Sequence, residues 1–195
     1  MSMPRLIAAA ALTLAGAAHA QIVVFTDNFD ANALGLNTTP SGWVVSGGTV
    51  DIIGNPGFYD FLPGNGRYVD MDGSTGNAGK MSIQLNLTGG LLHTLSFDLA
   101  GNRRNGGQER VDVSIGTMSS SHSLPQNAGF TAYSLQFTPG STGAYTLSFE
   151  GAGGDNIGML LDRVQVTAVP EPQTWALLGL GLAAVGGIAR RRRAA

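Results

Sequence analysis

The octapeptide MSIQLNLT at residues 81–88 places an apolar residue at every second position. Side chains of a β-strand point alternately to opposite faces, so this period of two predicts a strand with one buried and one solvated face. Residues 94–99, TLSFDL, repeat the pattern soon afterwards. Strands with one apolar and one polar face are typical of antiparallel sheets with one wetted side.

The same alternation continues along most of the chain. Further strands are expected at residues 111–115, 133–137 and 145–149, and shorter or noisier ones at 22–26, 43–45, 49–53, 67–71 and 160–166. Clusters of Gly, Asn, Pro and Ser between them are typical of turns. Ten short strands without a convincing soluble helix predict an all-β domain. We expect a β-sandwich with jelly-roll topology rather than a repeat array, because the strands share no motif at fixed spacing.

The first 20 residues have the pattern of a secretory signal peptide. Arg5 supplies the positive start, residues 6–18 are apolar, and Ala18-His19-Ala20 is a cleavage site of the A-x-A type. We therefore expect residues 1–20 to be removed on export. The remaining residues 21–168 are expected to form one domain, long enough for a single sizeable core.

Residues 169–195 combine a proline motif, an apolar run and a basic cluster. The run at 175–189 is uncharged and spans about 22 Å as a helix, which is short for a hydrocarbon core of about 30 Å. Trp175 suits one membrane interface, and the four arginines that follow the run suit the cytoplasmic one. A single transmembrane helix is therefore predicted over 175–189. The alternative, a buried core helix, leaves its glycines and the adjoining like charges unexplained.

These three parts in this order resemble the PEP-CTERM sorting signal of Gram-negative, exopolysaccharide-producing bacteria, a segment also known as an ice-binding protein C-terminal domain. The resemblance covers about 25 residues and implies no ice binding. It implies processing by an exosortase, a membrane cysteine transpeptidase, which releases or attaches the ectodomain outside the inner membrane. The residues to which it assigns recognition, not catalysis, are Val169, Pro170, Glu171, Pro172, Arg190, Arg191, Arg192 and Arg193.

The composition of the expected mature domain limits its partners. Residues 21–168 contain six basic and twelve acidic residues, a net charge near −6, which argues against nucleic acid as a partner. The sequence contains no cysteine, so no disulfide can stabilise an exported domain. The burial of apolar side chains must therefore stabilise the domain, and a bound metal ion could add to that stability.

A second resemblance covers most of this domain. The segments DNFD at 27–30, GW at 42–43, YVDMDG at 68–73, LSFDLAG at 95–101 and LDRV at 161–164 resemble the galactose-binding-like jelly rolls. In carbohydrate-binding members of that fold, an acidic residue of the first strand and an aspartate of the last share a structural calcium ion. The resemblance places this Ca²⁺ at Asp30 and Asp162. The sequence departs from the pattern with Asp30 in place of Glu and Arg163 in place of Asn.

Asp162 is also unusual because it occupies a position of the strand pattern where apolar residues are expected. Alternation puts it on one face with Leu160, Val164 and Val166, where an unpaired charge costs several kcal/mol, of the order of 2–7. Calcium held by oxygen ligands is one compensation. Pairing with Arg163 after a local bulge, or hydrogen bonds within a turn, is the other, and the sequence leaves both open.

Sugar binding needs an aromatic platform beside polar groups. The segment GFYDF at 57–61 is unusually aromatic for a connection between strands, and Trp43 and Tyr68 precede and follow it. We hypothesise a glycan site that includes Trp43, Tyr59 and Tyr68. The alternative is a hydrophobic plug over one end of the sandwich.

The inventory of reactive residues is poor. A cysteine nucleophile is impossible, His93 is expected at a strand edge, and His122 is expected in a solvated serine-rich loop. The sequence predicts a non-catalytic surface or matrix protein associated with exopolysaccharide or a biofilm. One alternative is a glycan hydrolase or lyase that uses the strand-face carboxylates Asp98, Asp112 or Glu150. Another is a self-associating structural protein of the matrix.

Overall fold

The computed structural model describes residues 21–57, 59–105 and 107–169, together with five helical positions, Gly179, Gly181, Leu182, Ala184 and Val185. The predicted signal peptide lies outside the described residues. So do Phe58, the PEP triplet at 170–172, most of the predicted transmembrane helix and Arg190–Arg193. Within the described part of the chain, no helix combines the length and the apolar character that crossing a membrane requires.

The domain consists of strands, as predicted. They are β1 (Ile22–Asp27), β2 (Val44–Ser46), β3 (Asp51–Gly54), β4 (Arg67–Asp70), β5 (Lys80–Leu87), β6 (Leu92–Ala100), β7 (Glu109–Ile115), β8 (Met118–Leu124), β9 (Thr131–Phe137), β10 (Gly143–Ala152) and β11 (Leu160–Val169). Every predicted strand has its counterpart here, and β8 is an addition.

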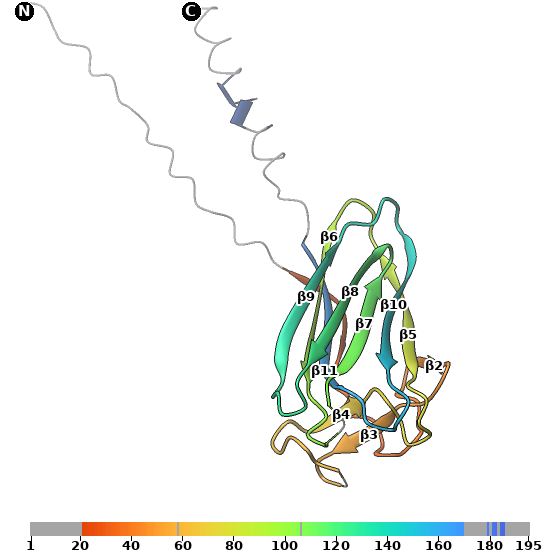
Figure 1. Ribbon diagram of the computed structural model, residues 1–195. Helices are drawn as coiled ribbons and strands as arrows, with labels where there is room; N and C mark the ends of the chain where they lie inside the picture. Colours follow the sequence, from red (N-terminus) through yellow and green to blue (C-terminus); the bar gives the residue numbers. More distant parts are fainter. Residues whose placement is uncertain are drawn as a thin grey trace, which may run out of the picture. The chain divides into compact units, whose positions relative to one another are not determined.

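Two antiparallel sheets face each other in a sandwich (Figure 1). One has the order β2-β5-β10-β7-β8. The other has the order β3-β4-β11-β6-β9, with β1 also paired to β11. β4 pairs with the start of β11 and β1 with its later residues, so these two strands follow one another along the same side of β11. β3 and β4 lie at the lower end of the sandwich in Figure 1.

The main core fills the space between the sheets. Its buried side chains come from alternate positions of nearly every strand, which is what a period of two requires. The fully or almost fully buried members include Phe29, Trp43, Met71, Met81, Leu87, Leu95, Phe97, Leu99, Val111, Val113, Ile115, Leu147, Phe149, Leu161, Val164 and Val166. Burial of this apolar surface is the principal force that stabilises a chain without disulfides.

A second, smaller cluster lies on the opposite face of the six-stranded sheet. Three of its buried members, Tyr68, Ala100 and Leu160, adjoin main-core residues in their strands and therefore point the other way. The other buried members are Ile53 and Leu62, and Phe61 and Phe130 pack against the cluster. The connection between β3 and β4 supplies Phe61 and Leu62 and so covers this face. The outer face of the six-stranded sheet is thus apolar and buried at this end.

The unpredicted strand β8 corrects the interpretation of the serine-rich segment. Ser119, Ser121 and Ser123 are register partners of β7 residues, and His122 points inward, where its ring lies 4.3 Å from that of Tyr133. His122 is therefore in an edge strand and not in a solvated loop. His93 was expected at an edge, but β6 is a central strand and the side chain is 1% exposed.

A bulge in β11 corrects the predicted surroundings of Asp162. The register with β6 shifts between Asp162 and Gln165, and Arg163 has a positive φ of 50°. As a result, Asp162 shares the outer face with Leu160, whereas Val164 and Val166 belong to the main core. The pairing with Arg163 after a bulge, one of the two predicted compensations, is present: Arg163 Nε lies 3.7 Å from Asp162 Oδ2. The backbone N–H of Arg163 also donates to Asp162 Oδ1 over 2.7 Å.

Candidate functional site

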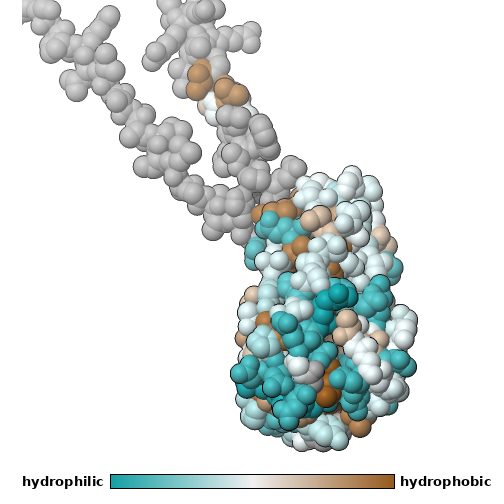
Figure 2. Space-filling model, in the orientation of Figure 1, coloured by the Kyte–Doolittle hydropathy of each residue, from teal (hydrophilic) through white to brown (hydrophobic). Residues whose placement is uncertain are grey.

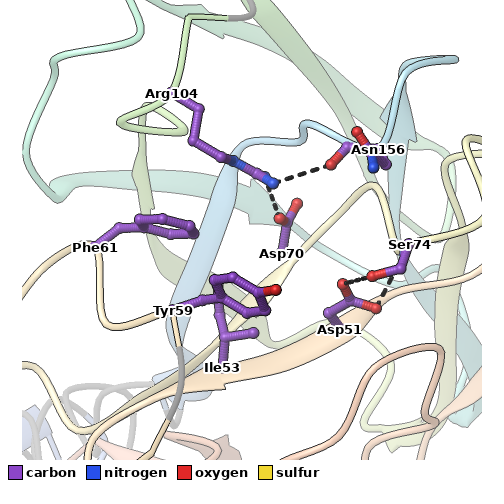
Figure 3. Close-up of a pocket in the computed structure, with 8 residues that line it drawn as sticks. All are labelled: Asp51, Ile53, Tyr59, Phe61, Asp70, Ser74, Arg104 and Asn156. Atoms are coloured by element: carbon purple, nitrogen blue, oxygen red, sulfur yellow. Dashed lines mark hydrogen bonds and ion pairs between the residues drawn. The ribbon is translucent and has the colours of Figure 1, made fainter.

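A hollow of about 230 Å³ opens at the end of the sandwich that carries β3 and β4. Figure 2 shows hydrophilic side chains gathered over this end. The lining comes from two strands and four connections that are far apart in sequence: Asp51, Ile53, Tyr59, Phe61, Asp70, Ser74, Arg104 and Asn156 (Figure 3). We call it the β3–β4 pocket.

One wall of the β3–β4 pocket is aromatic. The rings of Tyr59 and Phe61 stack with centroids 5.9 Å apart and planes inclined by 24°. The Arg104 guanidinium lies over the Phe61 ring at 5.0 Å from its centroid. Tyr59 is 55% exposed, a high value for a tyrosine that packs on another ring. This wall therefore offers a ring to solvent beside a fixed cation.

The floor is built from two aspartates that leave adjacent strands side by side. Asp51 and Asp70 are register partners on β3 and β4. Asp51 Oδ2 accepts a hydrogen bond of 2.7 Å from Ser74 Oγ, and its Oδ1 accepts one of 2.6 Å from the Asn37 N–H. Both carboxylates are therefore held in fixed orientations at the bottom of the hollow (Figure 3).

Asp70 forms the central ion pair of the pocket. Arg104 Nη2 bonds to Asp70 Oδ2, and Arg104 Nη1 donates to the Asn156 carbonyl over 3.0 Å. Burial raises the pKa of Asp70 to about 7, although Arg104 pulls the pKa down. The backbone amides of Asp72 and Gly158 donate hydrogen bonds to the other oxygen, Asp70 Oδ1. Arg104 thus ties the loop after β6 to the loop after β10 across the pocket.

Three of the six described non-glycine residues with positive φ lie at or beside the same hollow. Tyr59, Arg103 and Asn156 have φ values of 57°, 58° and 66°, a region that non-glycine residues rarely adopt. Two of them line the β3–β4 pocket and the third precedes Arg104. Strain of this kind costs about 1–3 kcal/mol per residue and is found preferentially at functional sites. This favours a binding site here over the alternative of a hydrophobic plug at the end of the sandwich.

A second hollow, of about 290 Å³, contains the two predicted calcium ligands. Its lining is Asn28, Asp30, Gly64, Asn65, Gly66, Asp162 and Arg163. The structure therefore brings together Asp30 from the turn after β1 and Asp162 from β11. Burial raises the pKa of Asp162 to about 7, and the nearby charge of Asp30 adds to this.

The donor set of this second hollow suits a hard cation. Asp30 accepts hydrogen bonds of 2.8 Å from the Arg67 N–H and from Asn28 Nδ2, so its carboxylate is already oriented. Calcium takes six to eight oxygens, which carboxylates, amide carbonyls and water supply together. Across the described residues, however, no three side chains of the His, Cys, Asp or Glu type are grouped closely enough for a metal ion. Any ion here would depend on amide and backbone oxygens in addition to Asp30 and Asp162.

Two of the three predicted glycan-binding residues are packing residues instead. Trp43 is 5% exposed, packs against Phe25 and Phe149, and donates from Nε1 to Asp27 Oδ2 over 2.8 Å. Tyr68 is fully buried under the β3–β4 connection, and burial raises its pKa to about 12. Neither presents a ring face to a ligand, so this part of the hypothesis is corrected. Tyr59 alone of the three lies in a hollow.

The carboxylates proposed for the enzyme alternative are not gathered in a cleft. Asp112 and Glu150 are direct partners across β7 and β10, but each forms an exposed ion pair of 3.0 Å, with Arg110 and Lys80 respectively. Asp98 lies on β6 of the other sheet and pairs with Arg163 at 2.7 Å. Neither of the two hollows contains any of the three.

Most of the β3–β4 pocket escaped the sequence analysis. Asp51 and Asp70 are polar residues in otherwise buried strand segments, and that interruption is the one local signal that pointed to them. Ser74, Arg104 and Asn156 lie in loops with no distinguishing motif. Pairing between distant strands brings these positions together, and the sequence of a single segment does not predict that pairing.

Comparison with known proteins identifies the C-terminal segment. Residues 168–193 match the PEP-CTERM protein-sorting motif, which confirms the predicted sorting signal. The match begins within β11, where Ala168 pairs with His93 and Val169 with Leu92. The first two residues of the matched motif therefore belong to the last strand of the sandwich. No curated protein matches the chain.

Solved structures share the fold of the sandwich. The K3 cleaved adhesin domain of Lys-gingipain from Porphyromonas gingivalis is 17% identical with a TM-score of 0.54, covering 76% of this chain and 99% of that one. The CBM22-1 xylan-binding domain of Paenibacillus barcinonensis Xyn10C is 14% identical with a TM-score of 0.52, covering 78% and 98%. At these identities the likeness concerns the fold alone, and it agrees with the predicted galactose-binding-like jelly roll.

A longer protein also matches. The CBM22-1-GH10 modules of a Clostridium thermocellum endo-1,4-β-D-xylanase, complexed with xylohexaose, are 18% identical with a TM-score of 0.48. The match covers 76% of this chain and 29% of that one, so this chain spans less than a third of it.

Proposed function

We propose that this protein is an exported, non-catalytic glycan-binding protein, and that the β3–β4 pocket holds the sugar. The observation that carries this proposal is the combination of an exposed stacked ring, an oriented guanidinium and two fixed carboxylates in one hollow. Sugar rings present an apolar face and a rim of hydroxyls, and these are the two kinds of contact that the pocket offers. The xylan-binding domain of similar fold adds support from a neighbour.

The dimensions of the β3–β4 pocket favour one sugar unit. Pockets for drug-sized ligands measure about 300–1,000 Å³, and this hollow of about 230 Å³ is smaller. It is formed by four connections over β3 and β4 at one end of the sandwich, and it is not a groove along the length of a sheet. Recognition of a chain end or a single branch residue follows better from this shape than recognition of an extended polymer.

The sorting motif supports a place outside the cell. We propose that an exosortase processes the protein near Pro170, Glu171 and Pro172, after export through the inner membrane and anchoring by the apolar segment at 175–189. The sandwich then works at the cell surface or in the extracellular matrix, in association with exopolysaccharide. Its first strand begins at Ile22, directly after the predicted signal-peptide cleavage site, so the processed chain keeps all of its strands.

Calcium bound by Asp30 and Asp162 is part of the same proposal. When bound, the ion would neutralise two carboxylates that repel each other and fix the turn after β1 against β11. Asn28 and Asn65 line the same hollow and carry amide oxygens that calcium accepts as ligands.

Binding to neutral oligosaccharides tests the central part of the proposal. We expect Tyr59→Asn to weaken binding in affinity electrophoresis or calorimetry by about tenfold, the effect of one lost aromatic contact of roughly 1.4 kcal/mol. Asn is chosen because it tolerates the positive φ at this position. Val44→Asn, on an edge strand of the other sheet and 63% exposed, is the control and should bind as the parent does. Equal binding by both variants would reject the pocket as the glycan site.

A further inference from the structure

The two ends of the sandwich differ in charge. At the end opposite to β3 and β4, where β1 begins and β11 ends (Figure 1), the connections are residues 88–91, 116–117 and 138–142, and none of these residues is Asp, Glu, Lys or Arg. β11 has no acidic or basic residue after Arg163, and β6 has no acidic residue, lysine or arginine before Asp98. We call this end the uncharged end. The connections at the β3–β4 end, by contrast, carry Asp30, Asp60, Asp72, Arg103, Arg104 and Asp155.

Apolar side chains are exposed at the uncharged end. Of the seven large apolar side chains that are exposed on the described sandwich, four lie here: Ile22, Val23, Leu92 and Met118, which are 53%, 55%, 38% and 42% exposed. β11 lies between β1 and β6, and its last residues pair with Ile22 on one side and with Leu92 on the other. Exposed apolar side chains therefore flank the point at which the chain leaves the sandwich, in a region without charged groups.

The chain leaves the uncharged end close to the predicted membrane segment. Five residues, 170–174, separate Val169 at the end of β11 from Trp175 at the start of the apolar run. The six steps from Val169 to Trp175 span at most about 22 Å, at about 3.6 Å per step. β11 runs ten residues from Leu160, which pairs with Asp70 at the pocket end, to Val169, about 30 Å at about 3.3 Å per residue. The connection is therefore too short for the sandwich to stand on a membrane by its β3–β4 end, whereas the uncharged end can reach the lipid.

We propose that the uncharged end contacts the lipid surface of the membrane that anchors the chain, with Ile22, Val23 and Leu92 at the boundary between headgroups and acyl chains. This inference rests on the proposed anchoring by residues 175–189. Apolar side chains gain free energy at this boundary, and no charged group of the uncharged end has to be dehydrated there. Anionic headgroups repel the acidic residues of the opposite end, which favours the same orientation. The β3–β4 pocket then opens away from the membrane.

Site-specific fluorescence quenching tests the contact. The chain contains no cysteine, so one introduced cysteine carries a label at a chosen place. Ser141→Cys labels the uncharged end, and Asn127→Cys labels the exposed connection between β8 and β9 at the other end. The chain from Gln21 to Ala195 is reconstituted in phosphatidylcholine vesicles that contain lipids with a nitroxide near the headgroup. We expect the label at 141 to be quenched about threefold more strongly than the label at 127, because a surface contact of this kind reaches about 5–10 Å into the headgroup boundary.

Two double variants of equal charge show whether the apolar side chains make the contact. Val23→Glu with Leu92→Glu places two carboxylates in the lipid contact and should lower the quenching at 141 by about threefold, to the level of the label at 127. Leu36→Glu with Val44→Glu is the matched control, because these side chains are 42% and 63% exposed near the β3–β4 end. The control adds the same charge and should leave the quenching at 141 unchanged. Circular dichroism checks that both double variants retain their strands.

The outcomes separate the lipid contact from the anchoring on which it rests. Equal quenching of the two labels in a vesicle-bound chain would overturn the contact and leave the anchor standing. A loss of quenching that is the same for both double variants would also overturn it, because net charge would then govern the approach to the lipid. Dimers that protect the label at 141 from the nitroxide would assign the uncharged end to a second copy instead.

Two further measurements keep the proposals apart. A chain that does not float with the vesicles would reject anchoring by residues 175–189 and the lipid contact with it. Glycan binding by the β3–β4 pocket is measured on the sandwich alone, residues 21–170, which forms a compact unit of its own. Its presence or absence is therefore decided independently of the vesicle experiment.

Discussion

The outer faces of the two sheets have opposite characters. On the five-stranded sheet, serines follow one another across four neighbouring strands at Ser82, Ser148, Ser114 and Ser119, and the charged groups form exposed ion pairs. On the six-stranded sheet, loops cover a small apolar cluster and enclose carboxylates that lack full compensation. The first face is largely solvated, although Ser148 is only 4% exposed, and its charged groups are paired. The second encloses buried charge and residues of positive φ, and it is the face at which we propose that the glycan binds.

Loss of an arginine should distinguish the two faces most strongly. Arg104→Met leaves Asp70 buried without its partner, and we expect the free energy of unfolding to fall by about 3 kcal/mol. Arg110→Met breaks an exposed pair with Asp112 and should change it by less than about 0.5 kcal/mol. Urea unfolding followed by tryptophan fluorescence measures both. Equal losses would remove the distinction between the faces.

Calcium should stabilise the domain through carboxylates of the six-stranded side and not through those of the five-stranded sheet. An ion at a concentration about 100 times its dissociation constant adds about 2.7 kcal/mol to the free energy of unfolding, so the melting temperature should rise by several degrees. Asp162→Asn should abolish the rise, while the acid-to-amide control Asp112→Asn should retain it. A melting temperature that is the same in excess calcium and in chelator would reject the calcium proposal.

Asp70 in the six-stranded sheet and His122 in the five-stranded sheet should contribute to the pH dependence of the free energy of unfolding with opposite signs. The pKa of Asp70 is about 7 in the folded state and near 3.8 when unfolded, because burial, aided by the adjacent charge of Asp51, outweighs the effect of Arg104. The folded state therefore binds the extra proton between these values, so this contribution is present at low pH and is lost as the pH rises towards 7. Relative to the parent, Asp70→Asn should flatten this loss, by an amount on the order of 2 kcal/mol between pH 4 and pH 7.

His122, in the five-stranded sheet, should show the smaller and opposite effect. Burial lowers the pKa of His122 below 6.5, so the unfolded state binds the proton first and stability falls as the pH drops through that range. His122→Gln should remove a loss of less than about 1 kcal/mol, because the ring is only partly buried between Phe97 and Tyr133. Unfolding midpoints measured from pH 7 to pH 5 test this. A larger loss with the glutamine variant would contradict the assigned direction.

Sequence reasoning succeeded where the pattern was local. The alternation at 81–88 and 94–99 predicted β5 and β6 because one face of each is apolar. It missed β8, in which serines stand where apolar residues mark other strands and His122 is the inward-facing ring. A bulge near Arg163 was one of two alternatives that the sequence left open, and alternation alone could not choose it, because the bulge reverses the faces of the residues that follow it.

The candidate site was harder to predict for a physical reason. Tyr68 occupies an outward position of β4 and is buried because the connection of residues 55–66 and the ring of Phe130 pack over it. Tyr59 lies on the same connection and remains exposed. Whether an aromatic residue packs or binds is decided by which loop covers it. Asp51, Arg104 and Asn156 likewise converge through pairing between distant segments.

Residue-resolved NMR titration of the isotope-labelled sandwich with a neutral oligosaccharide tests the central claim most directly. We predict that the amide shifts cluster at Tyr59, Ser74, Arg104 and Asn156, around the β3–β4 pocket. Shifts confined to the serine-bearing face of β5, β10, β7 and β8 would contradict the assignment of function to the six-stranded side.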